Sequence, residues 1–528
     1  MQAPRAGRAR PAPAGDAALA AALIAGGDAR LALDPTSGLN PYGCRPLPRP
    51  DEISLSSSTA STISSRGFTA AQAAFARLEE ARERGTFASV FAETADELRA
   101  VLRRRLGLPD AEIVLSPSGT DSALQALFLA RGLLGKPVTS IVVAADESGN
   151  GVPAAASGRH FAVSASGGRA VAKGAPVTGL GCAAVTIAAR DGQGRARPPS
   201  EVDAEVLRAV EAAIRTGNGI VLHVMDHSKL GSRAPSLACL HEICAVAPAD
   251  VQVVIDACQL RLSRARLRWY LDRGFLVLVT GSKFFTGPPL SGGLIVPEAL
   301  WARAARIGEV PAGLADYAAR DDWPSGFAGI RDRLPARHNI GQLLRWTAAS
   351  EDIRAYSAVP ELFRTVALAE FAAAAVRTIE RFPEVALVAD EVAAPADHAL
   401  DGGEFAARTI FPFTVTHAGR PLALAQARAL HRALNLDLTR SGLPGAPDTA
   451  AALCHIGQPV PVGDGTGGTT GALRISADAR LVSDSWVGAG DLVPTGRLTR
   501  RLDQIATVFE KLRFLLPHLD RLEGLGPS

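Results

Sequence analysis

Seven short apolar runs recur between residues 112 and 297, and each is followed by a helix-like segment or a glycine-rich turn. The apolar residues are continuous rather than alternating with polar ones, which is typical of strands buried on both faces of a mostly parallel sheet. The runs are EIVLS (112–116), SIVVAA (140–145), AAVTIA (183–188), GIVLHVM (219–225), VQVVIDA (251–257), FLVLVTG (275–281) and GGLIVP (292–297). The pattern predicts an α/β fold in which a mostly parallel seven-stranded sheet is covered by helices.

Segments whose apolar residues have helical spacing lie before and after these runs. Residues 69–107 place apolar side chains at the intervals of amphipathic helices, and residues 357–382 read as one long helix. Beyond about residue 350, the strand-like segments 409–416 and 472–477 alternate with helical segments such as 422–435. This mixture predicts a smaller α+β domain after the large one.

These changes divide the chain into four parts. We expect a disordered tail at 1–15, an N-terminal extension with helices at 16–110, a large domain at 111–350 and a small C-terminal domain at 351–528. The N-terminal segment has early arginines and a short apolar run, as a secretion signal does. Asp16 interrupts that run and no clear cleavage site follows, so a tail followed by a helix is favoured.

The composition is that of an ordinary globular protein. Of 528 residues, 47% are hydrophobic and 21% are charged, and the formal net charge is +3. No basic run is dense enough for a nucleic-acid or lipid surface, and no apolar stretch reaches the ~18 residues of a membrane span. The six cysteines lack CxxC spacing, so neither a metal site nor a disulfide framework is indicated. We expect a cytoplasmic protein whose partners are small molecules or a second copy of itself.

Lysine is scarce in this chain. Lysine and arginine together number 56, and only five of these are lysines, at positions 136, 173, 229, 283 and 511. Where positive charge alone is needed the chain uses arginine, so a remaining lysine can mark chemistry that needs a neutral amine, such as attack on a carbonyl to form an imine. Lys283 follows the apolar run 275–281 and precedes a loop of Gly, Pro and Thr.

A helix is predicted to begin directly after the first strand. Ser118, Gly119 and Thr120 open it, and exposed backbone N–H groups with the Thr120 hydroxyl can hold a phosphate at the positive end of the helix dipole. The same residues are equally compatible with a simple helix cap. Their position favours binding, because open α/β sheets bind ligands at the carboxyl ends of their strands.

Three charged residues occupy comparable positions. Asp256 lies at the end of a predicted strand, where a carboxylate is costly to bury without a partner, and Lys283 follows the next strand. Arg474 lies in a later strand, where it can clamp a carboxylate. Alone, each is compatible with an ordinary role as a cap, a surface charge or an ion pair. Together with a phosphate cradle they match pyridoxal 5′-phosphate, which needs an imine-forming lysine, an acid at its ring nitrogen and an amino-acid substrate.

Five motifs extend this pattern in a fixed order: SGTDSALQAL, HVMDHSKLGSRAPS, VVIDACQ, TGSKFFTGPPLSGGL and LRIS. In this combination the chain resembles the fold-type I pyridoxal-phosphate enzymes, specifically the class V aminotransferase and cysteine desulfurase-like group. The resemblance covers about residues 110–300 strongly and 301–490 more loosely. It implies a large cofactor-binding domain, a small-molecule amino-acid substrate and a homodimer.

The resemblance also implies roles for individual residues. Lys283 is expected to form the Schiff base with the cofactor, and Asp256 to pair with its ring nitrogen. The other expected contacts are with the phosphate (Ser118, Gly119, Thr120, Thr280 and Ser282), with the ring hydroxyl or imine region (Ser228 and Gln259) and with the substrate carboxylate (Arg474).

Several residues leave alternatives open. Lys229 is a rival imine lysine, but it precedes Asp256, whereas the cofactor lysine is expected on the strand that follows. Cys454 lies in a place loosely comparable to that of a desulfurase thiolate, although a small core residue is favoured. His455 is expected to bind substrate or to pack the domain interface. Glu147 lies near the place where the group has an aromatic residue over the ring, either as an acid–base group or as a structural hydrogen-bonding partner.

These features predict a pyridoxal-phosphate-dependent lyase or transferase. The favoured hypothesis is β-elimination of the carbon–sulfur lyase type, as in a cysteine desulfurase-like enzyme, with Lys283 removing the α-proton. A class V aminotransferase that passes the amino group to an oxo-acid is the alternative. A non-catalytic sensor is a third, but it should have an added helix-turn-helix or a broken set of site residues, and the sequence has neither.

Overall fold

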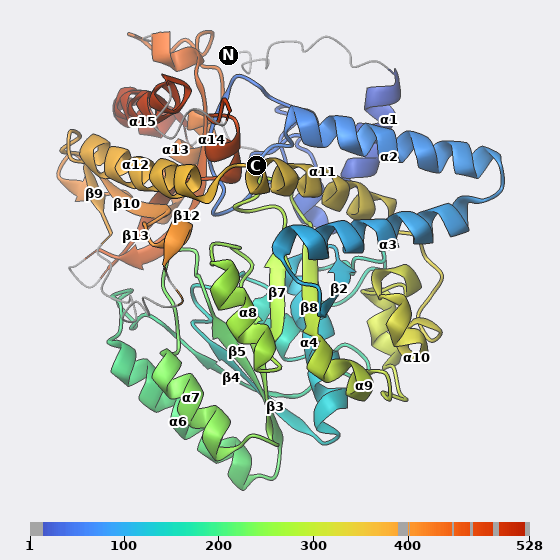
Figure 1. Cartoon of the computed structure of the whole chain (residues 1–528). Coiled ribbons are helices and arrows are strands. Elements are labelled where there is room, and N and C mark those ends of the chain that lie inside the picture. Colours follow the sequence, from blue (N-terminus) through green and yellow to red (C-terminus); the bar gives the residue numbers. More distant parts are fainter. Residues whose placement is uncertain are drawn as a thin grey trace.

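The computed structural model describes residues 14–388, 400, 402–445, 448–464, 468–488 and 496–522. A seven-stranded sheet forms the lower body of the molecule in Figure 1, with the strand order β2-β8-β7-β6-β5-β3-β4. The strands are β2 (Ala111–Ser116), β3 (Val138–Val143), β4 (Ala183–Ile187), β5 (Gly219–Met225), β6 (Val251–Asp256), β7 (Leu276–Thr280) and β8 (Gly292–Pro297). Only β8 runs antiparallel to its neighbours, which confirms the predicted α/β fold with a mostly parallel sheet.

Helices cover both faces of this sheet because most of its strands are apolar and buried on both sides; the edge strand β4 differs from the prediction, since its residues before Ile187 are exposed. α4 (Gly119–Leu134) packs against one face, over Val254 and Leu276. It begins after the N-cap Ser118 and ends at Gly135, whose φ of 64° is left-handed. The opposite face is covered by α6 (Pro199–Arg215), α7 (Leu237–Val246) and α8 (Arg264–Asp272).

A second sheet joins the N-terminal extension to the C-terminal part of the chain. Its order is β1-β12-β13-β10-β11, and β9 pairs with β10. β1 (Glu52–Leu55) runs parallel to β12 (Leu453–Gly463), so two segments far apart in the sequence pair directly. The remaining strands are β9 (Val385–Leu387), β10 (Ile410–His417), β11 (Arg420–Pro421) and β13 (Thr469–Ser476). The strands predicted at 409–416 and 472–477 are thus present.

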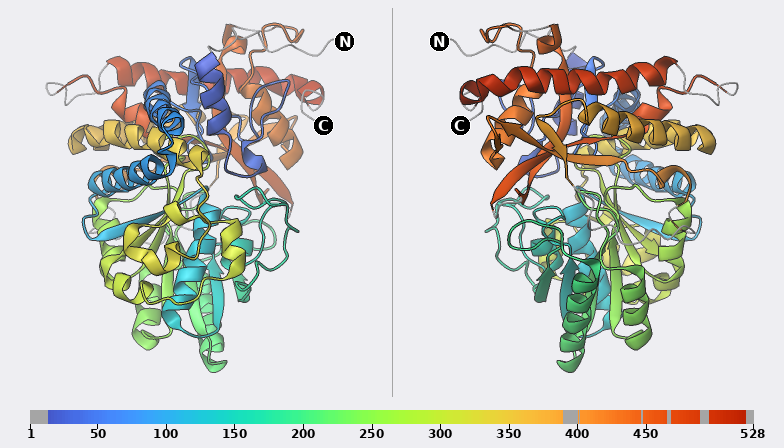
Figure 2. Two further views of the ribbon diagram at one scale, coloured as in Figure 1. Left: turned by 90° about the vertical axis from the view of Figure 1, so that its right-hand side faces the viewer. Right: turned by 90° about the vertical axis from the view of Figure 1, so that its left-hand side faces the viewer.

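Long helices pack around the second sheet and against each other. In Figure 2, α15 runs along the outer side of this sheet, and α2 and α3 lie beside α11. The longer helices are α1 (Ala14–Leu23), α2 (Ser65–Glu83), α3 (Phe87–Leu106), α11 (Ile340–Ser357), α12 (Glu361–Ile379), α13 (Leu424–Leu434) and α15 (Gly496–Leu515). Shorter ones are α5 (Val152–Ala156), α9 (Trp301–Ala304), α10 (Ala328–Arg331), α14 (Ala479–Ser483) and α16 (Leu519–Leu522).

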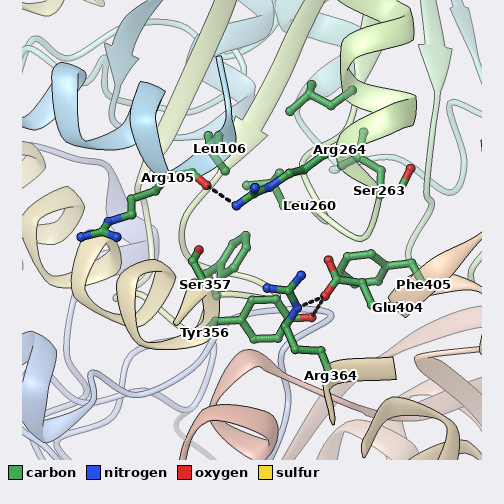
Figure 3. Close-up of a pocket in the computed structure, with 13 residues that line it drawn as sticks. Arg105, Leu106, Leu260, Ser263, Arg264, Tyr356, Ser357, Arg364, Glu404 and Phe405 are labelled. Carbon is green, nitrogen blue, oxygen red and sulfur yellow. Dashed lines mark hydrogen bonds and ion pairs between the residues drawn. The ribbon is translucent and has the colours of Figure 1, made fainter. Parts of the chain in front are cut away.

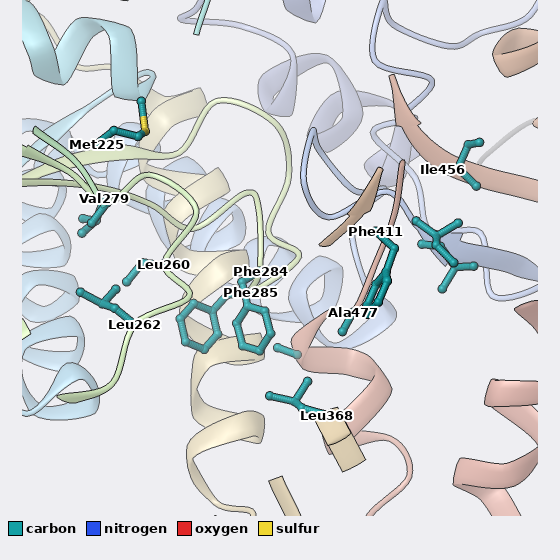
Figure 4. Close-up of a cluster of buried hydrophobic side chains, with 14 of the residues drawn as sticks. Met225, Leu260, Leu262, Val279, Phe284, Phe285, Leu368, Phe411, Ile456 and Ala477 are labelled. Atoms are coloured by element: carbon teal, nitrogen blue, oxygen red, sulfur yellow. The ribbon is translucent and has the colours of Figure 1, made fainter. Parts of the chain in front are cut away.

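One continuous apolar core joins the two sheets. Figure 4 shows its middle, where Phe284 and Phe285 from the loop after β7 lie between the large sheet and the second one. Val279 belongs to the large sheet, and Phe411 and Ile456 belong to the second. Burial of aromatic and aliphatic side chains from both sheets fixes the loops after β6 and β7 between them.

The predicted helices differ from the observed ones at their boundaries. The segment predicted as helical at 69–107 forms two helices, because Gly85 between them has a left-handed φ of 72°. The segment at 357–382 becomes helical only at Glu361, directly after Pro360. The boundary predicted at 350 falls inside α11, and most of the tail predicted at 1–15 lies outside the described residues. No helix in the described part of the chain is both long and apolar enough to cross a membrane.

Candidate functional site

Three neighbouring strands of the large sheet end at the same edge. β5, β6 and β7 are parallel, and in their register Met225 lies beside Asp256, which lies beside Leu278. Lys283 follows β7 by three residues, and its charge and that of Asp256 both act on the buried thiol of Cys258. The predicted amine and the predicted carboxylate therefore meet at the edge where open α/β sheets bind ligands.

The loop that contains Lys283 is a tight turn against a helix. The N–H of Gly281 donates to the carbonyl of Ser291, and the N–H of Gly287 donates to that of Gly281, both at 2.9 Å. A Cβ on Gly281 or Gly287 would lie 2.6 or 2.4 Å from the Cβ of Ala349 on α11. Glycine is needed at both positions because any side chain would push the turn away from α11.

The Asp256 carboxylate is buried, with 7% of the residue exposed. Its Oδ1 accepts a hydrogen bond from the backbone N–H of Cys258 at 3.1 Å. Among the described residues Asp256 forms no ion pair, and its carboxylate contacts the backbone N–H and the thiol of Cys258, which leaves capacity at Oδ2 for a donor from outside the protein. A buried carboxylate with one open oxygen is suited to a ligand that carries an N–H group.

The first turn of α4 has a hydroxyl whose hydrogen bonds are filled and two backbone N–H groups without a helical partner. The Ser118 hydroxyl accepts from Arg30 Nη2 at 3.0 Å and from the N–H of Asp121 at 3.3 Å, and it donates to the Asp121 carboxylate. Ser118 therefore has no bond left for a phosphate in this arrangement. The N–H groups of Gly119 and Thr120 have no partner within the helix, so these two residues are the available part of the predicted cradle.

Gly119 is closely enclosed by the ends of β6 and β7. A Cβ at this position would lie 2.5 Å from Cys258 Sγ and 3.2 Å from Thr280 Cγ2. The Thr280 hydroxyl donates to the Cys258 carbonyl at 2.7 Å, which joins the two loops. Gly119 and Thr280 thus lie together as predicted, but the Thr280 hydroxyl already donates its hydrogen bond, whereas among the described residues the Ser282 hydroxyl has no hydrogen-bond partner.

The loop after β3 is held by a buried ion pair. Arg190 Nε lies 2.7 Å from Glu147 Oε1, and the Ser228 hydroxyl donates to Glu147 Oε2. The Ser228 oxygen also accepts from the N–H groups of Leu230, at 3.1 Å, and Ser232, at 2.9 Å. The hydroxyl of Ser228 is saturated, so the predicted ring contact would require one of these bonds to break. Of the two roles considered for Glu147, these contacts support the structural one.

The same loop approaches the start of α4. A Cβ on Gly151 would lie 3.0 Å from Thr120 Cγ2, and one on Gly149 would lie 3.9 Å from Thr120 Oγ1. Asn150, between them, accepts a hydrogen bond from Lys229 Nζ at 3.1 Å. The ESGNG segment therefore connects the predicted phosphate cradle with the loop after β5.

Arg474 lies on β13 and is 2% exposed. Its Nε and Nη2 donate to the Gln458 carbonyl at 3.1 and 2.7 Å, Nη2 also donates to Thr59 Oγ1 at 2.9 Å, and Nη1 donates to the Lys229 carbonyl at 3.3 Å. These bonds use four of the five N–H groups, and no carboxylate among the described residues pairs with this cation. Burial lowers the pKa of Arg474 to about 10. One N–H group remains for a ligand, where a bidentate clamp needs two.

His455 is completely buried on β12. Its Nε2 lies 2.8 Å from the Tyr42 carbonyl, and its Nδ1 lies 3.1 Å from Glu52 Oε1 and 3.2 Å from Ser56 Oγ. Both ring nitrogens are engaged with the N-terminal extension. These contacts support the packing role considered for His455, and they leave no nitrogen for a substrate.

The N-terminal extension contributes Arg30, which sequence reasoning missed, and Ser58 and Thr59, which lie in the SSSTAST segment (56–62) that the resemblance to the pyridoxal-phosphate group places near the substrate. Arg30 reaches Ser118 across 88 positions, and Thr59 meets Arg474 across 415. Gln259, predicted near the ring, donates its Nε2 to the Ser58 carbonyl at 3.0 Å across 201 positions. Because these pairs are so distant in the chain, no local pattern could have indicated them.

None of the six cysteines has the properties of a reactive thiolate. Burial raises the pKa of every thiol in the chain. Cys454 is completely buried, its pKa is raised to about 11, and its Sγ lies 3.8 Å from the Ala452 carbonyl. A nucleophilic thiolate needs a lowered pKa and exposure, so Cys454 is the core residue that the sequence favoured.

A separate, partly open pocket lies beside the loop after β6 (Figure 3). Leu260 and Phe285 form part of its apolar wall. On its other side Glu404 Oε2 lies 2.5 Å from Arg364 Nε in an ion pair, and it accepts a hydrogen bond from the Tyr356 hydroxyl at 2.7 Å. Its lining includes none of the predicted site residues, so it is distinct from the candidate site.

Comparison with known proteins finds similarity at the level of structure. No family model matches the sequence, and no curated protein matches it. The solved structures that resemble the chain include pyridoxal-phosphate enzymes, the group that the motifs predict.

Three of these structures show how similar they are to this chain in sequence and in fold. The cysteine desulfurase CsdA from Escherichia coli is 13% identical, with a TM-score of 0.49 over 88% of this chain and 96% of that one. The cystine C-S lyase C-DES, in complex with cysteine persulfide, is 14% identical, with a TM-score of 0.48 over 90% and 99%. Oryza sativa TDC with PLP and tryptamine is 13% identical, with a TM-score of 0.48 over 91% and 85%.

Proposed function

We propose that the protein is a pyridoxal 5′-phosphate-dependent enzyme that acts on an amino acid. The observation that carries this proposal is the meeting of Lys283, the open Oδ2 of Asp256 and the open first turn of α4 at one edge of the sheet. An aldehyde, a ring nitrogen and a phosphate are the three groups by which this cofactor is held. The residues present offer one partner for each group: an amine for the aldehyde, a hydrogen-bond acceptor for the ring nitrogen and N–H donors for the phosphate.

We assign residues to the cofactor according to the hydrogen-bond donors and acceptors that they have left unused. Lys283 would hold the aldehyde carbon, and Asp256 Oδ2 would accept a hydrogen bond from the ring nitrogen. The N–H groups of Gly119 and Thr120, together with the Ser282 hydroxyl, would bind the phosphate. When bound, the cofactor supplies an electron sink for the carbon that carries the substrate amino group.

The remaining groups act on the substrate. The free N–H of Arg474 binds the α-carboxylate and thereby fixes how the α-carbon faces Lys283. The Nζ of Lys283 would take the α-proton. Asp256 would accept the hydrogen bond of the ring nitrogen and so hold the cofactor ring in place.

For the reaction itself we propose β-elimination. Sulfur transfer to a protein cysteine requires a reactive thiolate, and burial raises the pKa of all six thiols of this chain. Elimination from a β-substituted amino acid needs no such thiol. With L-cysteine and one water, it would give pyruvate, ammonia and sulfide in equal amounts. The class V aminotransferase remains the second candidate.

The cofactor assignment is tested on the purified protein with added pyridoxal phosphate. We expect a yellow protein that borohydride bleaches, with the label on the peptide that contains Lys283. Lys283→Ala should abolish the absorbance and the label, whereas Lys173→Ala, at an exposed lysine, should leave both unchanged. A colourless wild-type protein, or a label on Lys229, would refute the assignment.

The reaction type is tested by product analysis with β-substituted amino acids in the absence of any oxo-acid. Elimination should continue for many turnovers and release oxo-acid and ammonia in a one-to-one ratio. An aminotransferase should stop after one turnover per site and resume only when an oxo-acid is added.

We also propose that the protein is a homodimer. Light scattering on the protein as it elutes from a sizing column would measure its mass and test this.

A further inference from the structure

The five lysines fall into clearly different environments. Lys136 pairs with the carboxylate of Asp250. Lys511 is completely buried and gives all three N–H groups to backbone carbonyls, at 2.5–3.0 Å. Lys173 is exposed on the surface. Lys229 and Lys283 remain, and both lie in loops at the ligand-binding edge of the large sheet.

Lys229 is held in place by its backbone. Its N–H donates to the Glu147 carbonyl at 3.4 Å, and its own carbonyl accepts from Arg474 Nη1 at 3.3 Å. Its Nζ donates one hydrogen bond, to the neutral amide oxygen of Asn150 at 3.1 Å. The residue is therefore fixed between the ESGNG loop and Arg474, with two of its three ammonium N–H groups available.

The charges around Lys229 do not balance. Glu147 is already paired with Arg190, and Asp256 faces the place of the cofactor ring. Arg474 binds only carbonyls and a hydroxyl. Within the described part of the chain, Arg474 is a buried cation and Lys229 a half-buried one, and neither forms an ion pair with a carboxylate. Burial, then Arg474 and Lys283, lower the pKa of Lys229 to about 8, although the charges of Glu147 and Asp256 act in the opposite direction.

We propose that the substrate is an amino acid with a second anionic group on its side chain. Arg474 receives the α-carboxylate, and the ammonium of Lys229 receives the second anion, so the bound substrate supplies both missing counter-charges. A buried cation is costly unless it is paired, and a charge-assisted hydrogen bond to it is strong and directional. This inference rests on the proposed function and specifies its substrate class.

The test compares isosteric acids and amides. Isothermal titration calorimetry of the protein loaded with pyridoxal phosphate measures the affinity for L-aspartate against L-asparagine, and for L-glutamate against L-glutamine. In at least one pair we expect the acid to bind about tenfold or more tightly than the amide, as is typical of a hydrogen bond to a charged group. Equal affinities in both pairs would overturn the proposal.

Two variants assign the preference to Lys229. Lys229→Met removes the cation. Asn150→Asp keeps the lysine but places a carboxylate on it, at an exposed position where a fold defect is not expected. Both should lower the acid-to-amide preference to within about twofold of unity while the affinity for the amides stays the same, and Lys173→Met should change nothing. Retention of the preference in both variants would refute the role of Lys229.

The outcome is separable from that of the proposed function. The absorbance of the same samples reports whether the cofactor is bound, independently of which amino acid binds. A colourless protein would contradict the proposed function, and equal affinities in a yellow protein would contradict the substrate class alone.

Discussion

Gly119→Ala should weaken both the fold and the phosphate cradle at a single, defined contact. The added Cβ would lie 2.5 Å from Cys258 Sγ, far inside the normal contact distance, and 3.2 Å from Thr280 Cγ2. Both neighbours are buried at the edge where β6 and β7 end. Overpacking of this kind costs about 1–3 kcal/mol, because α4 must move away from the loops that it contacts.

The structure also predicts which second change relieves the clash. Cys258→Ala removes Sγ and leaves the Cys258 Cβ, which lies 3.7 Å from the position of the added Cβ at residue 119, an ordinary contact distance. The double variant should therefore recover about 1–2 kcal/mol relative to the sum of the single changes, as neighbouring sites do when they share one steric conflict.

The assay has two readouts for wild type, both single variants and the double variant. Thermal unfolding of the apo protein measures the cost to the fold, and titration with pyridoxal phosphate followed by absorbance measures cofactor affinity. Gly119→Ala should lower the affinity by about tenfold or more, since every 1.4 kcal/mol corresponds to a factor of ten. If Gly119→Ala binds the cofactor as wild type does, or if Cys258→Ala fails to restore affinity, the assigned position of the phosphate is wrong.

Three further changes test other parts of the structure. Asp256→Asn should reduce turnover by at least about a hundredfold while some cofactor still binds, because a neutral amide no longer keeps the ring nitrogen protonated; steady-state rates and absorbance separate the two effects. Lys511→Met should destabilise the fold by about 2–4 kcal/mol in chemical unfolding, because three carbonyls lose charge-assisted hydrogen bonds. Burial raises the pKa of Asp352 from 3.8 to about 6, so between about pH 4 and 6 the native state holds a proton that the unfolded chain releases, and stability should fall as the pH rises through this window. In Asp352→Asn this fall should be smaller, and an unchanged pH profile of the unfolding temperature would contradict the assignment.

The large sheet could be predicted because its signal is local. Each strand is a continuous apolar run, so all seven follow from the hydrophobic pattern alone, and the runs at 219–225 and 292–297 coincide with β5 and β8. β1 was not predicted, because Glu52–Leu55 is short and half-buried, and its partner β12 lies in the C-terminal part of the chain. Pairing between such distant segments depends on tertiary packing, which no local pattern encodes.

The candidate site, like the fold, could be predicted from the sequence only in part. Lys283 and Asp256 meet because parallel neighbouring strands end at one edge, and that follows from topology. The state of each polar group does not follow, since it depends on the side chains that surround it. Ser228 and His455 have the right chemistry for a ligand, yet their hydrogen-bonding capacity is filled by Glu147 and by the N-terminal extension. Unused hydrogen-bonding capacity, rather than residue type, distinguishes the groups that can bind a ligand from the groups that hold the loops.

Unused hydrogen-bonding capacity also gives a reason for the presence of both Lys229 and Lys283 in the candidate site. Lysine scarcity selected five positions, and strand order favoured Lys283 over Lys229 for the cofactor, since Lys283 follows the strand after Asp256. The contacts give the second lysine a reason of its own. An arginine at position 229 would bring five N–H groups into a space bounded by Arg474, Asn150 and the ESGNG loop, whereas the compact ammonium of lysine can point two N–H groups at a bound anion. Under the proposed function, the two lysines would serve different ends of one substrate, the reacting carbon and the charged side chain.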